Sequence, residues 1–316
     1  MRHLITGGAG FIGSHLADYL MDQENEVRVM DNLSAGNLNN LERWLNDPRL
    51  EFVRGDLLNL AEAKNAIEGC TMVYHLAANP EVRVWRAPPE DNFKQNVEAT
   101  YNLLEALRRW GDAETLVFTS SSTVYGDVDV LPTPEYYTPL KPISHYGASK
   151  LAAEALISAY GSMYGFRCVI YRMANVVGPR CSHGVVYDFA EKLRKNPMAL
   201  EVLGDGTQSK SYLFIDDCLE GMVLGAERAK EMVEIFNIGS ADRVNVKTIA
   251  EIVIEEMGLK DVEVRLTGGV DGGRGWKGDV KLMHLDVSRL KSLGWRPQYS
   301  SAEAVRKTAR ALVQII

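Results

Sequence analysis

The first thirteen residues place a short apolar segment directly before three evenly spaced glycines. Residues 2–6 have the composition of a strand, and Gly7, Gly10 and Gly13 follow at intervals of three. Glycine lets a chain turn sharply off a strand, lets backbone N–H groups approach a ligand, and lets a helix pack closely on a sheet. A helical apolar pattern then covers residues 11–22. The chain is thereby constrained to begin with a βα unit whose turn can hold a pyrophosphate at a helix N-terminus.

An acid follows this unit at an informative distance. A second predicted strand, residues 26–30, ends in Asp31. In dinucleotide-binding folds, an acid roughly 20 residues beyond the glycines hydrogen-bonds the adenosine ribose, and its charge repels a 2′-phosphate. The glycine spacing differs from the usual Gly-x-Gly-x-x-Gly, so the prediction depends on this context. We predict NAD in preference to NADP; the alternative is a glycine-rich turn followed by an ordinary surface Asp.

Composition limits the class of partner. The chain has 316 residues, 46% hydrophobic and 24% charged, which is typical of a soluble globular protein. A net charge of −7 argues against nucleic acid or an anionic membrane as the main partner. No apolar run reaches the roughly 18 residues that span a bilayer, and a strand starting at residue 2 leaves no room for a signal peptide. Scattered cysteines and histidines predict a cytoplasmic protein with reduced thiols and no metal site.

Apolar strand patterns alternate with helical patterns through the first half of the chain. Strand patterns cover residues 2–6, 26–30, 50–53, 71–76, 115–120 and 167–173. Helical patterns cover residues 11–22, 60–68, 92–110 and 146–164. This alternation predicts an α/β fold, a Rossmann-type doubly wound parallel sheet with helices on both faces. Ligands of such sheets bind beyond the carboxyl ends of the strands, so the loops there are expected to carry the site.

The pattern changes beyond residue 176, where loops rich in glycine and proline separate shorter elements. This predicts a smaller C-terminal lobe, although residues 235–238 have the pattern of one further sheet strand. We therefore expect a dinucleotide-binding domain of residues 1–176 together with 211–240. The second lobe would comprise residues 177–210 and 241–316.

A tyrosine and a lysine four residues apart begin the helical pattern at residue 146. Tyr146 and Lys150 would share one face of that helix. A phenol near pKa 10 is a poor base at neutral pH, and a neighbouring cation would lower that pKa by stabilising the phenolate. Lys150 could also hydrogen-bond a nicotinamide ribose. The alternative is a surface i,i+4 pair on an amphipathic helix.

Serines follow the strand pattern at 115–120. Ser120, Ser121 and Ser122 lie where a hydroxyl could face a nicotinamide ring, although serines at strand ends are also ordinary polar loop residues. The glycine turn, the acid, the serines and the Tyr/Lys pair occur in the order that a hydride-transfer site requires. We therefore predict a redox site built on a bound dinucleotide.

These motifs together resemble those of the extended short-chain dehydrogenase/reductases. The matching segments are 6–13, Asp31-Asn32, 55–57, 75–78, 120–126 and Tyr146-x-x-x-Lys150. Within that group the chain is most similar to the UDP-glucose (UDP-galactose) 4-epimerases, over essentially its whole length. The resemblance implies an NAD-dependent isomerase of galactose metabolism that acts on a UDP-sugar, with the second lobe binding the nucleotide sugar.

The resemblance also implies a reaction. Ser121, four residues before Tyr125, would be the catalytic hydroxyl. Tyr146 would take the proton from the sugar 4-hydroxyl while the C4 hydride passes to NAD⁺, with Lys150 as the third catalytic residue. The 4-keto sugar would rotate and take the hydride back on its other face.

The resemblance assigns binding residues by position. On the cofactor side these are Gly7, Gly10, Phe11, Ile12, Gly13, Asp31, Asn32, Ser34, Gly36, Asp56, Leu57, Leu76, Ala77, Ala78, Asn96, Tyr146, Lys150 and Val176. On the substrate side they are Ser121, Ser122, Thr123, Tyr146, Asn175, Val186, Lys210 and Arg274. Lys210 and Arg274 would hold the diphosphate; the alternative is solvated loop charges. The family commonly has Arg at the position of Lys210, and many relatives have Lys at the position of Pro80.

The residues after the catalytic hydroxyl distinguish the reactions of this group. Dehydratases usually have Asp-Glu there, and UDP-glucuronate decarboxylases usually have a Glu, whereas this chain has Ser122 and Thr123. A 4-epimerase of UDP-galactose/UDP-glucose is therefore favoured. The alternatives are a UDP-N-acetylhexosamine or UDP-uronate 4-epimerase, for which a flexible Met283 could widen the pocket, or a dehydratase or dehydrogenase of the same superfamily.

Helical residues 92–110 and 146–164 carry apolar side chains on more than one face. In the family these two helices pair with their partner's copies as a four-helix bundle, so the resemblance implies a homodimer. The alternative is simple burial against the sheet.

Overall fold

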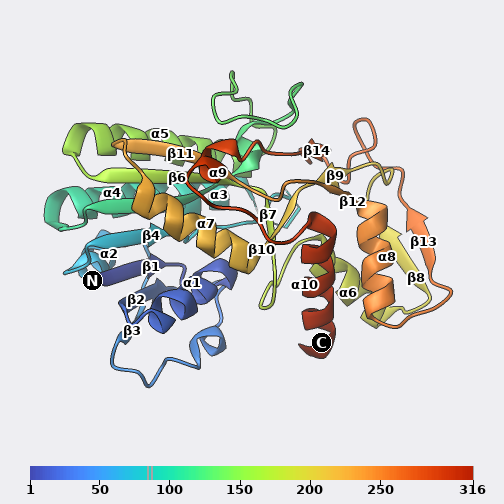
Figure 1. Ribbon diagram of the computed structural model, residues 1–316, viewed down its shortest axis with the longest axis horizontal. Coiled ribbons are helices and arrows are strands. Elements are labelled where there is room, and N and C mark those ends of the chain that lie inside the picture. Colours follow the sequence, from blue (N-terminus) through green and yellow to red (C-terminus); the bar gives the residue numbers. More distant parts are fainter. Residues whose placement is uncertain (84, 87, 316) are drawn as a thin grey trace. The chain divides into compact units, whose positions relative to one another are not determined.

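The central element of the fold is a seven-stranded sheet with the order β11-β6-β5-β4-β1-β2-β3 (Figure 1). The computed structural model describes residues 1–83, 85–86 and 88–315. The strands of the sheet are β1 (Arg2–Thr6), β2 (Glu26–Asp31), β3 (Leu50–Arg54), β4 (Met72–His75), β5 (Thr115–Ser121), β6 (Arg167–Met173) and β11 (Val233–Ile238). The neighbours from β5 through β3 pair in parallel, with β1 between β4 and β2. The predicted strands and the predicted Rossmann-type sheet are confirmed.

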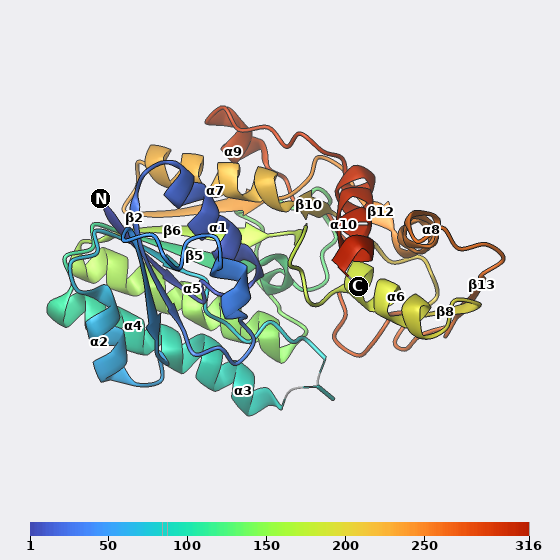
Figure 2. The same cartoon turned by 90° about the horizontal axis from the view of Figure 1, so that it is seen from below.

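The chain forms two compact units. Unit 1 comprises Met1–Val124, His145–Arg172 and Met222–Phe236. Its helices are α1 (Phe11–Asp22), α2 (Leu60–Ile67), α3 (Pro89–Phe93), α4 (Ala99–Trp110), α5 (His145–Tyr164) and the end of α7 (Ile215–Arg228). Figure 2 shows α1 on one face of the sheet and α2, α4 and α5 on the other. Between sheet and helices, residues such as Leu103, Phe118 and Ile157 form a buried apolar core.

The helix predicted over residues 92–110 differs from a regular α-helix. Between α3 and α4, the segment Lys94–Glu98 forms a π-helical turn. The hydrogen bonds of buried Asn96 hold this turn, and such tertiary contacts leave no mark on the apolar pattern of a sequence. Single π turns inside helices are frequent at functional sites.

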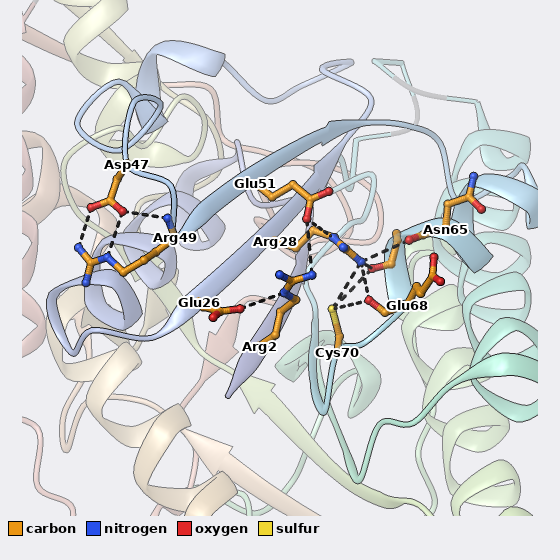
Figure 3. Close-up of polar contacts among 10 residues, drawn as sticks. Arg2, Glu26, Arg28, Asp47, Arg49, Glu51, Asn65, Glu68 and Cys70 are labelled. Carbon is orange, nitrogen blue, oxygen red and sulfur yellow. Dashed lines mark hydrogen bonds and ion pairs between the residues drawn. The ribbon is translucent and has the colours of Figure 1, made fainter.

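Buried Arg28 on β2 anchors the carboxyl end of α2 (Figure 3). Its guanidinium donates to the carbonyl oxygens of Ala66 at 2.9 Å and Glu68 at 2.8 Å, and to the Glu51 carboxylate at 2.8 Å. The last carbonyls of a helix have no partner within the helix, so a cation there satisfies them. Arg28 thereby fixes α2 against the strands that carry the predicted cofactor residues.

Unit 2 comprises Tyr125–Ser144, Met173–Gly221 and Asn237–Ile316. Three small sheets are formed by β10 (Tyr212–Phe214) with β7 (Asn175–Val177), by β12 (Val244–Asn245), β9 (Ser209–Lys210) and β14 (Leu282–Met283), and by β13 (Glu263–Leu266) with β8 (Ala199–Val202). Its helices are α6 (Val185–Lys195), α8 (Val246–Glu256), α9 (Ser288–Ser292) and α10 (Ser301–Ile315). Helices α6, α8 and α10 pack against one another within this unit (Figure 1).

Candidate functional site

The turn after β1 requires glycine for steric reasons. Gly7 has φ +69°, and its N–H donates to Met30 O at 2.8 Å. A Cβ at Gly7 would lie 2.7 Å from the backbone of Ala77, and one at Gly13 would lie 2.6 Å from Gly8 Cα. No side chain caps α1 at Gly10. The N–H groups of its first turn therefore face the turn, where phosphate oxygens can accept their hydrogen bonds.

Asp31 organises the loop at the end of β2. Its Oδ2 accepts from Ala9 N at 3.0 Å and its Oδ1 from Leu33 N at 2.8 Å, so the carboxylate is held between the glycine turn and its own loop. Gly36 lies directly over it, because a Cβ there would be 2.8 Å from Oδ2. Each carboxylate oxygen keeps a lone pair that can accept from a ribose hydroxyl. This position fits the adenosine ribose of a dinucleotide.

Neighbouring polar residues are fixed to the same edge of the sheet. Ser34 N donates to Asn32 Oδ1 at 2.9 Å, and Asn32 Nδ2 donates to Asp56 Oδ2 at 3.0 Å. Asp56 and the buried Leu57 follow β3, so these contacts join the loops of adjacent strands. The structure thus brings together Asn32, Ser34 and Asp56, three residues that were predicted to bind the cofactor.

The loop after β4 is tied to the π-helical turn. Leu76, Ala77 and Ala78 lead to Asn79, whose N–H donates to Asn96 Oδ1 at 2.7 Å. Asn96 Nδ2 donates in turn to Ser149 Oγ on α5 at 2.9 Å. The buried Asn96 amide therefore connects this loop to α5, the helix that carries Tyr146 and Lys150.

The predicted catalytic residues meet within unit 1. Ser121 ends β5 and forms a side-chain hydrogen bond with Tyr146 on α5. One turn along α5, the buried Lys150 donates from Nζ to Thr119 O at 3.0 Å, with its ammonium 5.9 Å from the Tyr146 ring centre. Ser121 Oγ also accepts from Thr123 N at 3.2 Å and from Thr123 Oγ1 at 2.9 Å. Because both accepting positions are filled, the Ser121 proton is available for Tyr146.

The pKa values of this group follow from burial. Desolvation raises the pKa of Tyr146 to about 12, opposed by its hydrogen bond with Ser121. Desolvation also lowers the pKa of Lys150 to about 7, opposed by the charge of Glu154. The prediction that Lys150 lowers the Tyr146 pKa is therefore wrong for these side chains by themselves. Burial is the largest cause of the raised Tyr146 pKa, and the Lys150 ammonium donates to the Thr119 carbonyl rather than to the phenol.

The cations predicted to bind the diphosphate lie in unit 2. Lys210 Nζ is 2.6 Å from Asp279 Oδ1, and Arg274 binds Asp127 through two hydrogen bonds of 2.9 and 2.8 Å. The side chains of Lys210 and Arg274 are only 19% and 20% exposed. They are thus partly buried ion pairs rather than solvated loop charges, and a bound anion would have to compete with two carboxylates for them.

The other predicted residues of unit 2 lie on regular elements. Asn175 and Val176 are on β7, where Asn175 Nδ2 donates to Ser211 O at 3.3 Å. Val186 lies buried in the first turn of α6. Met283 on β14 pairs in register with Lys210 on β9. Of the four residues of unit 2 that were predicted to bind the substrate, three therefore lie on a regular strand or helix: Asn175, Val186 and Lys210.

Sequence reasoning missed a second polar layer behind the catalytic residues. Glu154 on α5 and Arg172 on β6 form a buried ion pair, and His75 joins β1 to α4 through its two ring nitrogens. The signal for Glu154 was its spacing of four residues from Lys150. A charged pair on a helix is usually solvated, so its burial was visible only in the fold.

Comparison with known proteins assigns the chain to a family. Residues 3–239 match the model of the NAD dependent epimerase/dehydratase family. The chain belongs to this family. Its NAD dependence agrees with the glycine turn and with Asp31. The protein is therefore an enzyme with NAD as its cofactor.

Curated relatives cover nearly the whole chain. A putative UDP-glucose 4-epimerase of Methanocaldococcus jannaschii is 33% identical over 96% of this chain and 96% of its own length. UDP-glucuronic acid decarboxylase 6 of Arabidopsis thaliana is 35% identical over 96% of this chain and 87% of its own length. A crystal structure of a UDP-galactose 4-epimerase is 45% identical, with a TM-score of 0.89 and full coverage of both chains. The family members similar to this chain thus differ in the reaction named for them.

Membrane-spanning helices and metal sites were also expected to be absent, and the structure describes residues 1–83, 85–86 and 88–315. Among these residues, no helix has the length and apolarity needed to cross a membrane. Among the same residues, no group of three or more His, Cys, Asp or Glu side chains is arranged to hold a metal ion. All four cysteines are buried and free.

Proposed function

We propose that the protein is an NAD-dependent 4-epimerase that interconverts UDP-galactose and UDP-glucose. The observation that carries this proposal is the chemistry around Ser121. The residues that follow it, Ser122 and Thr123, carry hydroxyls. By the resemblance, dehydratases and UDP-glucuronate decarboxylases usually carry carboxylates there. A hydroxyl cannot act as the second acid or base of an elimination near neutral pH. What remains is a site suited to reversible oxidation of one alcohol.

The proposed reaction uses three side chains. Tyr146 removes the proton of the sugar 4-hydroxyl and returns it after the hydride is restored, while Ser121 donates a hydrogen bond to the reacting oxygens. Lys150 supplies positive charge behind the phenol and a donor for the nicotinamide ribose. When bound, NAD⁺ supplies the hydride acceptor for C4 and a positive charge that favours the phenolate.

The two units support a division of binding roles. In unit 1, the turn at Gly7–Gly13, the loop of Asp31, Asn96 and the Tyr146/Lys150 pair would hold NAD. The resemblance also assigns Val176 to the cofactor. In unit 2, Asn175 and Val186 would contact the nucleotide sugar, and Lys210 and Arg274 would bind its diphosphate once Asp279 and Asp127 release them. These assignments follow the resemblance stated above and the local geometry of each unit.

We also propose that the protein is a cytoplasmic homodimer of galactose metabolism, paired through residues 92–110 and 146–164. Large apolar side chains remain exposed on both helical segments, with Tyr101 44% and Met163 71% exposed. A four-helix bundle with a second copy would cover them. Sedimentation at micromolar concentration should give twice the mass of one chain, whereas a monomer would contradict this part of the proposal.

A substrate panel tests the function. Purified protein is incubated with UDP-galactose, UDP-N-acetylgalactosamine or UDP-glucuronate, without added NAD. We expect interconversion of UDP-galactose with UDP-glucose, because the cofactor is regenerated in each cycle. Buried Met283 beside Lys210 favours a second candidate, the UDP-N-acetylhexosamine 4-epimerase, and equal turnover of the N-acetyl sugar would support it. Absence of conversion for all three sugars would overturn the proposal.

A further inference from the structure

A buried ion pair lies outside the proposed catalytic set. Arg172 on β6 donates to the Glu154 carboxylate from Nε at 3.1 and 3.2 Å and from Nη2 at 2.8 Å. The two residues are only 4% and 3% exposed. Both belong to unit 1, and the strand that carries Arg172 lies next to β5 in the sheet.

The same carboxylate is attached to the end of β5. The Ser120 hydroxyl donates to Glu154 Oε1, and the preceding residue, Thr119, accepts from Lys150 through its carbonyl oxygen at 3.0 Å. Lys150 and Glu154 are one helical turn apart on α5. Lys150 and Glu154 therefore bind two consecutive residues of β5, Thr119 and Ser120, which immediately precede Ser121.

Stability alone gives no reason for this pair. Two charges removed from water lose their hydration, and well-packed apolar residues of similar volume often serve stability equally well. A bidentate Arg–carboxylate pair does fix geometry, because its planar donors accept only a narrow range of orientations. The pair is thus better suited to orienting its neighbours than to stabilising the fold.

We propose that Glu154 and Arg172 are positioning residues that hold the end of β5 and Lys150 in register for the reaction. Glu154 holds the end of β5 through its bond with Ser120 and lies one turn after Lys150, and Arg172 fixes the Glu154 carboxylate through donors from Nε and Nη2. The roles of Ser121 and Lys150 rest on the proposed function.

The charges around Lys150 make the inference testable. The groups that interact with its ammonium are Glu154 and Tyr146 on α5, His75 on β4, and the Phe118 ring and Thr119 carbonyl on β5. Buried His75 is neutral at physiological pH, because burial and Lys150 lower its pKa to about 3. Glu154 is therefore the carboxylate whose charge acts on Lys150 among the residues that the structure describes.

The primary test follows the titration of Lys150 by ¹³C NMR of lysine-labelled protein, with Lys150→Arg used to assign its signal. Glu154→Gln should move the midpoint down by roughly one pH unit, the effect of losing one nearby opposite charge. The matched control is Glu105→Gln on α4, which removes another buried carboxylate paired with Arg108 and should leave the midpoint unchanged. An unchanged midpoint in Glu154→Gln, or equal shifts in both variants, would overturn the proposal.

Kinetics separate positioning from folding. Glu154→Gln should lower kcat roughly tenfold with little change in KM. The alkaline limb of its pH–activity profile should also move to lower pH, because Lys150 loses its proton at a lower pH in this variant. The double variant Glu154→Leu/Arg172→Met should recover thermal stability without recovering kcat. Recovery of kcat together with stability would show a merely structural pair. Because the NMR titration requires no turnover, an inactive wild type would refute the proposed function while the positioning result remained readable.

Discussion

His75 gives the most quantitative prediction of this structure. The side chain is fully buried, with Nδ1 2.8 Å from Thr6 Oγ1 and Nε2 2.8 Å from Thr100 Oγ1. The Thr100 hydroxyl donates to Asn96 O at 2.7 Å, so its oxygen accepts from His75 Nε2–H. Nδ1 is then left to accept from Thr6. Every polar atom of the neutral imidazole is satisfied, and a second ring proton on Nδ1 could be accepted only if the Thr6 hydroxyl turned its own proton away from His75.

The cost of acidification follows from this arrangement. Burial, aided by the charge of Lys150, lowers the His75 pKa from 6.5 to about 3. Below pH 6.5 the unfolded chain binds a proton that the folded chain refuses, so this contribution to stability is complete above pH 6.5 and is lost as the pH falls towards 3. Below the unfolded-state pKa of 6.5, the free energy of unfolding falls by about 1.4 kcal/mol per pH unit. It is therefore about 2 kcal/mol lower at pH 5 than at pH 7.

Urea denaturation of the wild type and of His75→Gln at pH 7 and pH 5 measures this loss. Glutamine can still donate to Thr100 but does not titrate, and the other five histidines contribute equally to both proteins. The variant should be less stable at pH 7, and the difference should narrow by about 2 kcal/mol at pH 5. Parallel pH dependence in the two proteins would refute the assignment of a buried neutral His75.

Three further substitutions test the site. Thr123→Val removes a donor to Ser121 and should lower kcat about fivefold, the value of a hydrogen bond of roughly 1 kcal/mol, while Thr123→Ser should restore it; equally slow variants in steady-state assays would contradict this. Gly13→Ala places a Cβ 2.6 Å from Gly8 Cα, so the purified protein should carry less bound NAD, measured by chromatography of the denatured protein's extract. One NAD per chain in this variant would contradict the proposed role of the turn. Asp279→Asn releases the Lys210 ammonium and should strengthen inhibition by UDP, and weaker inhibition would show that Lys210 does not bind the diphosphate.

The sheet and the glycine turn could be predicted because local rules determine them. Apolar and β-branched runs such as residues 115–120 form buried strands in almost any α/β context. The glycines at 7 and 13 are required by direct steric contact, with Ala77 and with Gly8 respectively. Local sequence and tertiary structure agree there, and the predicted sheet is confirmed.

The polar layer behind the site could not be predicted in the same way. Lys150 and Glu154 have the spacing of a solvated helical pair, and only the docking of α5 against β5 and β6 buries them. The same burial reverses the expected direction of the Tyr146 pKa. The loss of hydration depends on which segments pack around a side chain. Here these segments come from distant parts of the chain, such as the strand β6 that carries Arg172.

The central claim is that a hydride leaves C4 of the sugar and returns to the same carbon. The direct measurement is incubation of UDP-galactose deuterated at C4 with purified protein in ordinary water, without added NAD, followed by mass spectrometry and NMR of the product. We expect UDP-glucose that keeps the deuterium at C4, with no accumulation of free NADH. Loss of the deuterium to solvent, or a 4-keto or dehydrated product, would contradict the account.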